Sequence, residues 1–197
     1  GIDRALKSGQ FSLSSQMSPV QIAAALLDAT PKDAIITILP GWRIEEVAAN
    51  VAASGLSVSG EQFLAAAQAP TQEYLALLQV TDVSTLEGFL YPGTYVLPRV
   101  SSLDDLLVMI LTEFSGNVDT SLMDGFERQG LTLVEAVILA SIIEREAVVT
   151  EEKPLIASVF FNRLEAGMRL ETDPTVQYAL GFDEATNSWW KSPLYLN

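Results

Sequence analysis

Residues 34–55, AIITILPGWRIEEVAANVAASG, contain a short apolar strand, a turn and an amphipathic helix in one run. Gly55 follows the helix, where glycine is a typical terminator. The same order occurs twice more along the chain. FSLS (11–14) precedes a helix from Ser18 with Pro19 at its first position, and GTYVLP (93–98) precedes SSLDDLLVMILTEF (101–114). The sequence therefore predicts an α+β fold that contains repeated β–α units.

The chain changes character along its length. Two further amphipathic segments, SGEQFLAAAQA and TQEYLALLQV, lie between the second and third units, so residues 1–80 are expected to form a small α+β module. Residues 81–197 are expected to form a mostly helical domain with short strands. Its predicted helices are 131–150, 154–167 and the run TDPTVQYALG, with a short strand at MRLE between the last two. Thr132 and Glu135 form the sequence pattern of a capping box.

Composition excludes several kinds of chemistry. The 197 residues include no Cys and no His, which removes thiol nucleophiles, thiolate zinc sites and imidazole-based triads. The formal charge is −14, which repels phosphate backbones, so nucleic acid is not an expected partner. The same charge is equally explained as a solubility device. No apolar run reaches the ~18 residues that a membrane span requires.

Glu144 is the strongest candidate for a catalytic group. On a helical wheel it lies within about 60° of Leu133, Val137, Ala140, Ser141, Ala147 and Val148. An acid among such side chains is expected to favour its neutral form and to donate a proton near neutrality. Glu146 falls on the opposite face and is expected to meet water. The alternative is that Glu144 forms a buried salt bridge, for instance to Arg163 or Arg169.

Further polar and aromatic residues in three segments are candidates for ligand binding. Asp173 is also explained as a helix cap before Pro174, and the aromatic residues near Glu87 suit ordinary packing as well as stacking on sugar rings. The candidate binding residues are Glu87, Tyr95, Ser141, Asn162, Arg163, Thr172, Asp173, Gln177 and Tyr178.

Four stretches together resemble the YceG-like family of endolytic murein transglycosylases. They are LEGFLYPGTYVLP (86–98), LASIIEREA (139–147), ASVFFNRLEAGMRLETDPTVQYALG (157–181) and SPLYLN (192–197). Residues 8–66 look like the preceding part of such proteins, which carries a LysM-like module. The family pattern continues past SPLYLN, so we expect the catalytic domain to be C-terminally truncated in this sequence.

The resemblance implies an enzyme that cleaves peptidoglycan between N-acetylmuramic acid and N-acetylglucosamine and leaves a 1,6-anhydro end. Its catalytic glutamate falls on Glu144, and neither a cofactor nor a metal is expected. It also implies a single-pass membrane protein whose anchor lies upstream of this sequence, with this portion outside the cytoplasm. Peptidoglycan strands and, by inference, peptidoglycan synthases are the expected partners.

Three other functions are alternatives to this one. A non-catalytic peptidoglycan-binding or scaffold module of the cell-wall synthesis machinery is the main alternative. A hydrolase would require a second carboxylate, for which Glu171 and Asp173 are the candidates. The family has also been labelled aminodeoxychorismate lyase, a pyridoxal-phosphate reaction, but four scattered lysines and no Gly-rich phosphate loop argue against it.

Overall fold

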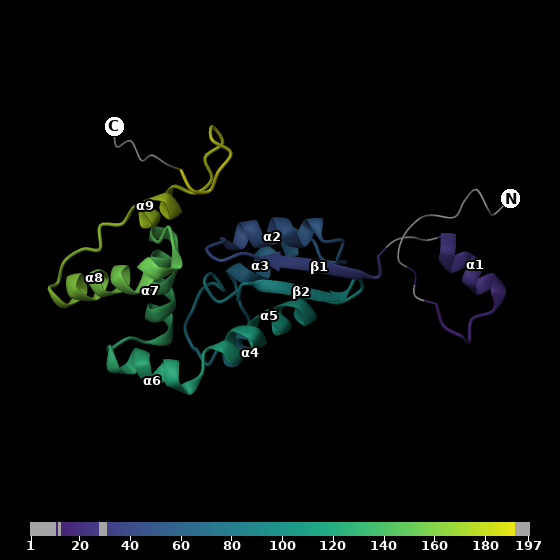
Figure 1. Ribbon diagram of the computed structural model, residues 1–197, viewed down its shortest axis with the longest axis horizontal. Helices are drawn as coiled ribbons and strands as arrows, with labels where there is room; N and C mark the ends of the chain where they lie inside the picture. The colour runs from purple at the N-terminus through teal and green to yellow at the C-terminus, as the bar shows by residue number, and fades with distance from the viewer. Residues whose placement is uncertain (1–10, 12, 28–30, 192–197) are drawn as a thin grey trace.

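A computed structural model describes residues 11, 13–27 and 31–191 of the chain. Its sheet is an antiparallel pair of strands, β1 (Asp33–Ile38) and β2 (Gly93–Pro98), in which Ile36 lies opposite Tyr95. Alternate residues of each strand are buried, as the two-residue period of a half-covered sheet requires. The helices α2 (Ile44–Ala53), α3 (Gly60–Gln68), α4 (Gln72–Leu77) and α5 (Leu103–Asn117) complete this α/β unit (Figure 1).

The hydrophobic core lies almost entirely in the α/β unit. The largest fully buried side chains all belong to residues 36–111, namely Ile36, Val47, Val51, Phe63, Leu86, Leu106, Leu107, Ile110 and Leu111. Full burial of one such side chain contributes about 1.5–3 kcal/mol. Most of the stabilisation by apolar burial therefore comes from this unit.

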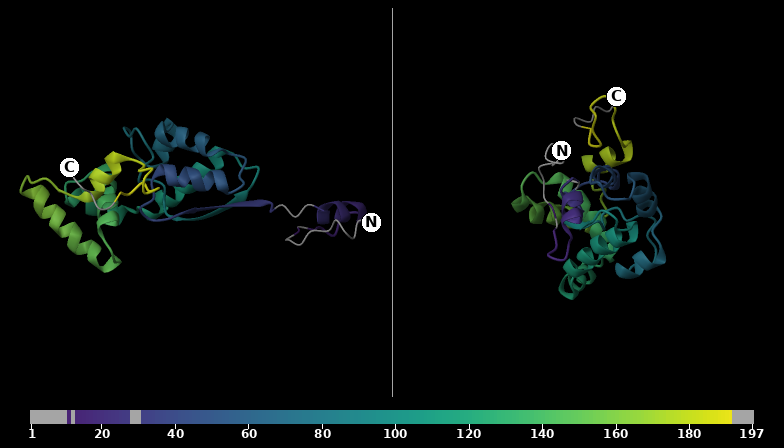
Figure 2. Two further views of the ribbon diagram at one scale, coloured as in Figure 1. Left: turned by 90° about the horizontal axis from the view of Figure 1, so that it is seen from above. Right: turned by 90° about the vertical axis from the view of Figure 1, so that its right-hand side faces the viewer.

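The remaining helices form a second group at one end of the molecule (Figures 1 and 2). It contains α6 (Thr120–Arg128), α7 (Leu133–Glu146), the 3₁₀ turn η2 (Thr150–Glu152), α8 (Lys153–Glu165) and α9 (Asp173–Leu180). Helix α7 is central, because it contacts α6, α8 and α9. Only Leu133 of this group joins the main core cluster as a buried residue. Helix α1 (Pro19–Leu27) buries none of its residues and lies apart from both groups.

The α+β prediction is confirmed, and so are the second and third β–α units. In the first unit the helix forms, but residues 11, 13 and 14 of FSLS are not in a strand, and residue 12 lies outside the described residues. Residues 28 and 29, the end of the predicted first helix, and the closing SPLYLN (192–197) also lie outside the described residues. The boundary at residue 80 stays a prediction, and the sheet joins one strand from each side of it.

Of the local predictions for the second group of helices, one is confirmed and three are wrong. The capping box is confirmed, since Thr132 Oγ1 accepts from the Glu135 amide at 3.2 Å. The predicted helix 131–150 instead ends at Glu146, because Ala147 has an extended backbone. No strand forms at MRLE. The cap position of α9 belongs to Thr172, so the prediction that Asp173 is the cap was wrong.

Candidate active site

Glu144 lies in the last turn of α7 and forms an ion pair. Its Oε2 is 2.7 Å from Nζ of Lys153, the first residue of α8, and each side chain is 33% exposed. The chain leaves α7 at Ala147 and reverses through η2, which returns the start of α8 to this end of α7. The partner is thus neither Arg163 nor Arg169, and the carboxylate stays in contact with solvent.

The surroundings of Glu144 differ from the apolar stripe that the helical wheel indicated. Leu133 is buried, but Ala140 and Ser141 are exposed and Val148 is 90% exposed. The Ser141 hydroxyl donates to the Ile138 carbonyl at 2.7 Å rather than to a neighbour across the surface. Small exposed side chains therefore leave the surface beside Glu144 open, and its carboxylate contacts a lysine rather than a stripe of aliphatic side chains.

Glu146 is placed differently from the prediction. It was expected to meet water, but it is half-buried and lines a cavity together with Arg163 and Thr172. Helix α8 packs against α7, so a face that an isolated helix would expose is partly covered.

The turn after β1 passes next to the end of α7. Gly41 has a φ of +75°, and a Cβ at this position would lie 3.1 Å from Cδ of Arg145 and 3.6 Å from Cγ of Glu144. Glycine meets both requirements, because it tolerates positive φ and has no side chain to occupy that space. The turn therefore holds the Glu144 end of α7 against the α/β unit.

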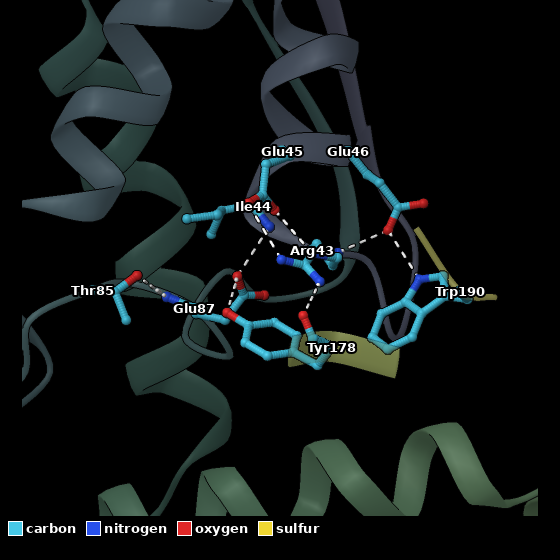
Figure 3. Close-up of polar contacts among 8 residues, drawn as sticks. All are labelled: Arg43, Ile44, Glu45, Glu46, Thr85, Glu87, Tyr178 and Trp190. Carbon is cyan, nitrogen blue, oxygen red and sulfur yellow. Dashed lines mark hydrogen bonds and ion pairs between the residues drawn. The ribbon is translucent and has the colours of Figure 1, made fainter. Parts of the chain in front are cut away.

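Arg43 joins the start of α2 to the C-terminal part of the chain (Figure 3). It is only 6% exposed, and its Nη1 donates to the Tyr178 carbonyl at 2.9 Å. Its Nε and Nη2 donate to the carboxylate of Glu45 at 3.1 and 3.4 Å. Its Cζ lies 4.1 Å from the ring centroid of Tyr178 and 4.7 Å from that of Trp189. Such a stacked, paired guanidinium is a strong anchor in a buried position.

Glu87 lies beside this arginine. Its Oε2 accepts from the Tyr178 hydroxyl and from the Ile44 amide, each at 3.3 Å (Figure 3). Burial raises the pKa of Glu87 above its usual range, and the hydrogen bond from Ile44 partly offsets that effect. Burial also raises the pKa of Tyr178.

Trp190 connects the same region to α7. Its Nε1 donates to Oε2 of Glu46 at 3.4 Å, and Cζ of Arg145 lies 3.9 Å from its ring centroid. Burial lowers the pKa of Arg145. The residue next to Glu144 is therefore fixed by an aromatic ring from the C-terminal segment.

The structure brings some of the predicted binding residues together and separates others. Glu87 meets Tyr178, and Arg163 shares a cavity with Thr172. Gln177 donates to the Lys191 carbonyl at 2.7 Å, whereas Asn162 and Asp173 are exposed.

Tyr95 is a core residue. Its hydroxyl donates to the Tyr91 carbonyl at 2.6 Å, and burial raises its pKa to about 12. Its ring is buried on the inner face of β2, so it is not available to stack on a sugar.

Sequence reasoning missed five residues of this site. The position of Arg43 could have indicated a role beyond helix capping, because it occupies the cap position of α2, where Ser, Thr, Asp or Asn is usual. The adjacent tryptophans near the C-terminus were another such signal. The missed residues are Arg43, Arg145, Lys153, Trp189 and Trp190.

Within residues 11, 13–27 and 31–191, no helix is both long and apolar enough to span a membrane. No group of three or more acidic side chains in this part of the chain is arranged to hold a metal ion.

The known proteins that resemble this chain in sequence agree with one another in family and name. Residues 1–193 match the YceG-like family. An endolytic murein transglycosylase of Streptococcus pneumoniae is 29% identical over 198 residues, covering 89% of this chain and 36% of the relative. Another of that name, from Bacillus subtilis, is 37% identical over 97 residues, covering 49% of this chain and 27% of the relative. The chain thus spans well under half the length of these relatives.

A solved structure is also similar. The crystal structure of a YceG-like protein from Listeria monocytogenes has a TM-score of 0.67 and 29% identity, covering 92% of this chain and 64% of that one. The match in sequence extends over nearly the whole chain, and the fold agrees with it. The chain belongs to the YceG-like family.

Proposed function

We propose that this protein is an endolytic murein transglycosylase that cleaves the bond between N-acetylmuramic acid and N-acetylglucosamine with Glu144 as its acid and base. The names of the relatives support the activity. The observation that carries the assignment of Glu144 is its position. Its carboxylate is one-third exposed at the end of α7, and one turn back the helix surface carries the small exposed side chains of Ala140 and Ser141.

The reaction requires one carboxyl group. Neutral Glu144 donates its proton to the glycosidic oxygen as the bond from C1 of the muramic acid to that oxygen breaks. The oxygen leaves as the hydroxyl of N-acetylglucosamine, and positive charge develops at C1. The C6 hydroxyl of the same muramic acid then attacks C1 and gives its proton to the Glu144 carboxylate. Glu144 ends neutral, and no water is consumed.

Lys153 contributes to the first step. Negative charge develops on Glu144 as its proton leaves, and an ammonium at 2.7 Å stabilises that charge.

The proposal extends to the setting of the enzyme. Peptidoglycan lies outside the cytoplasm, so we place this portion there, tethered to the membrane through an upstream segment and working beside peptidoglycan synthases. A LysM-like module within residues 1–80 would add glycan binding. Its compact β–α arrangement supports that role, although β1 pairs with β2 of the following part.

The test is the product formed from purified glycan strands. We expect the protein to yield anhydro-muropeptides, detected by mass spectrometry, and Glu144→Gln to yield none. Glu127→Gln is the matched control, because Glu127 is an exposed acid on α6. Products that carry an added water would identify a hydrolase instead.

The ion pair also favours a second candidate, a module that binds strands without cleaving them, because an ammonium-bound carboxylate is a poor proton donor. In that case the unsubstituted protein and Glu144→Gln both retain the strands, and neither releases anhydro products. Strand retention, measured by co-sedimentation with insoluble peptidoglycan, would then be the relevant property.

A further inference from the structure

A groove of about 720 Å³ lies between β2 and α5. Figure 1 shows α5 beside β2 and α2 beside β1, so the groove lies along the outer edge of β2. Its strand wall consists of Val96, Leu97 and Pro98, and the rest of its lining comes from Ser101 and one flank of α5. None of these residues takes part in the site around Glu144.

The backbone of β2 presents hydrogen-bonding groups at this edge. Thr37 lies opposite Thr94, and the Thr37 amide donates to Oδ1 of Asn50 at 3.0 Å instead of to β2. Because bonded and non-bonded pairs alternate between antiparallel strands, the amides and carbonyls of Thr94 and Val96 point away from β1. In the part of the chain that the structure describes, no other backbone group pairs with them there. Such an edge is a template for another strand.

The helix wall of the groove has an apolar middle and an acid at each end. Val108 and Met109 are 42% and 39% exposed, and Val96 on the strand wall is 55% exposed. Asp105 and Glu113 stand on either side of this apolar stretch along α5. Among the described residues, no lysine or arginine lines the groove or pairs with either acid. The groove therefore complements a segment with an apolar centre and basic ends.

The spacing of the two acids sets the order of residues in that segment. Asp105 and Glu113 are eight positions apart on one helix, which corresponds to about 12 Å along its axis. A β-strand advances about 3.4 Å per residue and points every second side chain to the same face. Basic residues at the first and fifth positions of an extended segment, with an apolar residue at the third, therefore match the acids and the apolar stretch between them.

We propose that an extended segment of a partner protein, with this basic–x–apolar–x–basic order, binds the groove as a third strand of the sheet. Its backbone pairs with Thr94 and Val96, and its apolar side chain packs on the middle of the helix wall. Its two basic side chains reach Asp105 and Glu113. A second copy of this chain is a poorer occupant, because pairing two β2 edges brings together the acids of two chains that each have a formal charge of −14.

The probe is the peptide acetyl-TKTVTKT-amide, which places two lysines and one valine on the same face of a strand. Its matched control is acetyl-TETVTET-amide, in which glutamates replace the lysines. Each is titrated into the full chain and followed by amide chemical shifts and hydrogen exchange in NMR. We expect saturable binding of the first peptide, slower exchange of the Thr94 and Val96 amides, and at least about fivefold weaker binding of the second. Equal affinities, or unchanged exchange at both amides, would overturn the proposal.

Val96→Pro removes an amide that points away from β1, and proline is tolerated at such an edge position. We expect it to weaken binding of the lysine peptide about three- to tenfold. Ile35→Pro is the matched control, because Ile35 lies directly opposite Val96 and its amide faces the other edge of the sheet. An equal loss of affinity in both variants would overturn the pairing with β2. The exchange measurement on the unsubstituted protein does not depend on how either variant folds.

Charge and occupant are tested separately. Glu113→Lys should weaken binding of the lysine peptide several-fold, whereas Glu127→Lys, at an exposed acid on α6, should leave it unchanged. Sedimentation velocity of the protein without peptide should show a monomer. A dimer in which the Thr94 and Val96 amides are already protected from exchange would show that a second copy occupies the groove, and it would overturn the proposal.

Discussion

Lys153 Nζ lies 2.7 Å from Oε2 of Glu144, joining the first residue of α8 to the last turn of α7. The two residues come together because α7 ends at Glu146 and η2 reverses the chain. The contact places a lysine ammonium beside the group that is proposed to release and regain a proton.

Lys153→Met is expected to lower kcat about tenfold while KM changes little, because the charge stabilises Glu144 mainly as its proton leaves. The pair is partly exposed, so solvent screening keeps the effect below that of a buried contact. Lys153→Arg should restore most of the rate, and Lys32→Met, at an exposed lysine, should leave it unchanged. Steady-state release of anhydro-muropeptides measures each variant. A rise in KM with kcat intact would show that Lys153 binds the strand instead.

Arg43→Met is expected to destabilise the protein by about 3 kcal/mol, because it leaves Glu45 without its buried partner. It also removes the hydrogen bond to the Tyr178 carbonyl and the cation stacked on Trp189. Denaturant unfolding followed by tryptophan emission measures the loss. The stability of Arg43→Lys should fall between that of Arg43→Met and that of the unsubstituted protein, since lysine keeps the charge but not the planar guanidinium. A midpoint equal to that of the unsubstituted protein would contradict the anchoring role.

Glu87→Gln is expected to stabilise the protein at neutral pH. Burial raises the pKa of Glu87 above 4.5, so the folded state binds this proton more tightly than the unfolded state does. Folding is therefore penalised as pH rises from about 4.5 through the raised pKa, and the penalty is absent at lower pH. Glutamine has no charge to desolvate and can still accept from the Ile44 amide. The difference in melting temperature between the two proteins should be near zero at pH 3 and should grow with pH; a constant difference would reject this cause.

Gly88→Ala is expected to weaken the contact between α7 and the α/β unit. Gly88 has a φ of +82°, and a Cβ there would lie 2.6 Å from Cγ1 of Val137. Gly130 has a φ of +72° with open space around it, so Gly130→Ala reports backbone strain alone, about 1–2 kcal/mol. We expect Gly88→Ala to be the more destabilising of the two in thermal unfolding.

Val137→Ala identifies the source of that difference. In the Gly88→Ala background it removes the crowded methyl group, so the double variant should regain part of the lost stability. Simple addition of the two single effects would show that the steric contact is not responsible.

The sequence predicted the local structure well where the physical cause is local. The apolar strand at residues 34–38 and the capping pair Thr132 and Glu135 act within a few residues, and both appear in the structure. The prediction of a strand at MRLE was wrong: the backbone there is irregular, and the carbonyls of Arg169 and Leu170 accept hydrogen bonds from Arg163 instead of from a neighbouring strand. The helical wheel placed Glu146 on a water-facing surface, but that surface is partly covered by α8. A helical wheel contains no information about which other helix packs on a given face.

The sequence by itself determined the fold class, the positions of most helices and the family pattern around Glu144, since periodicity, caps and motifs depend on neighbours along the chain. Only the tertiary structure decided that Lys153 pairs with Glu144, that Tyr95 is buried and that Arg43 reaches Tyr178, 135 residues away. These partnerships depend on how separate elements pack, and the surroundings that set a side chain's charge come from segments that local pattern does not connect.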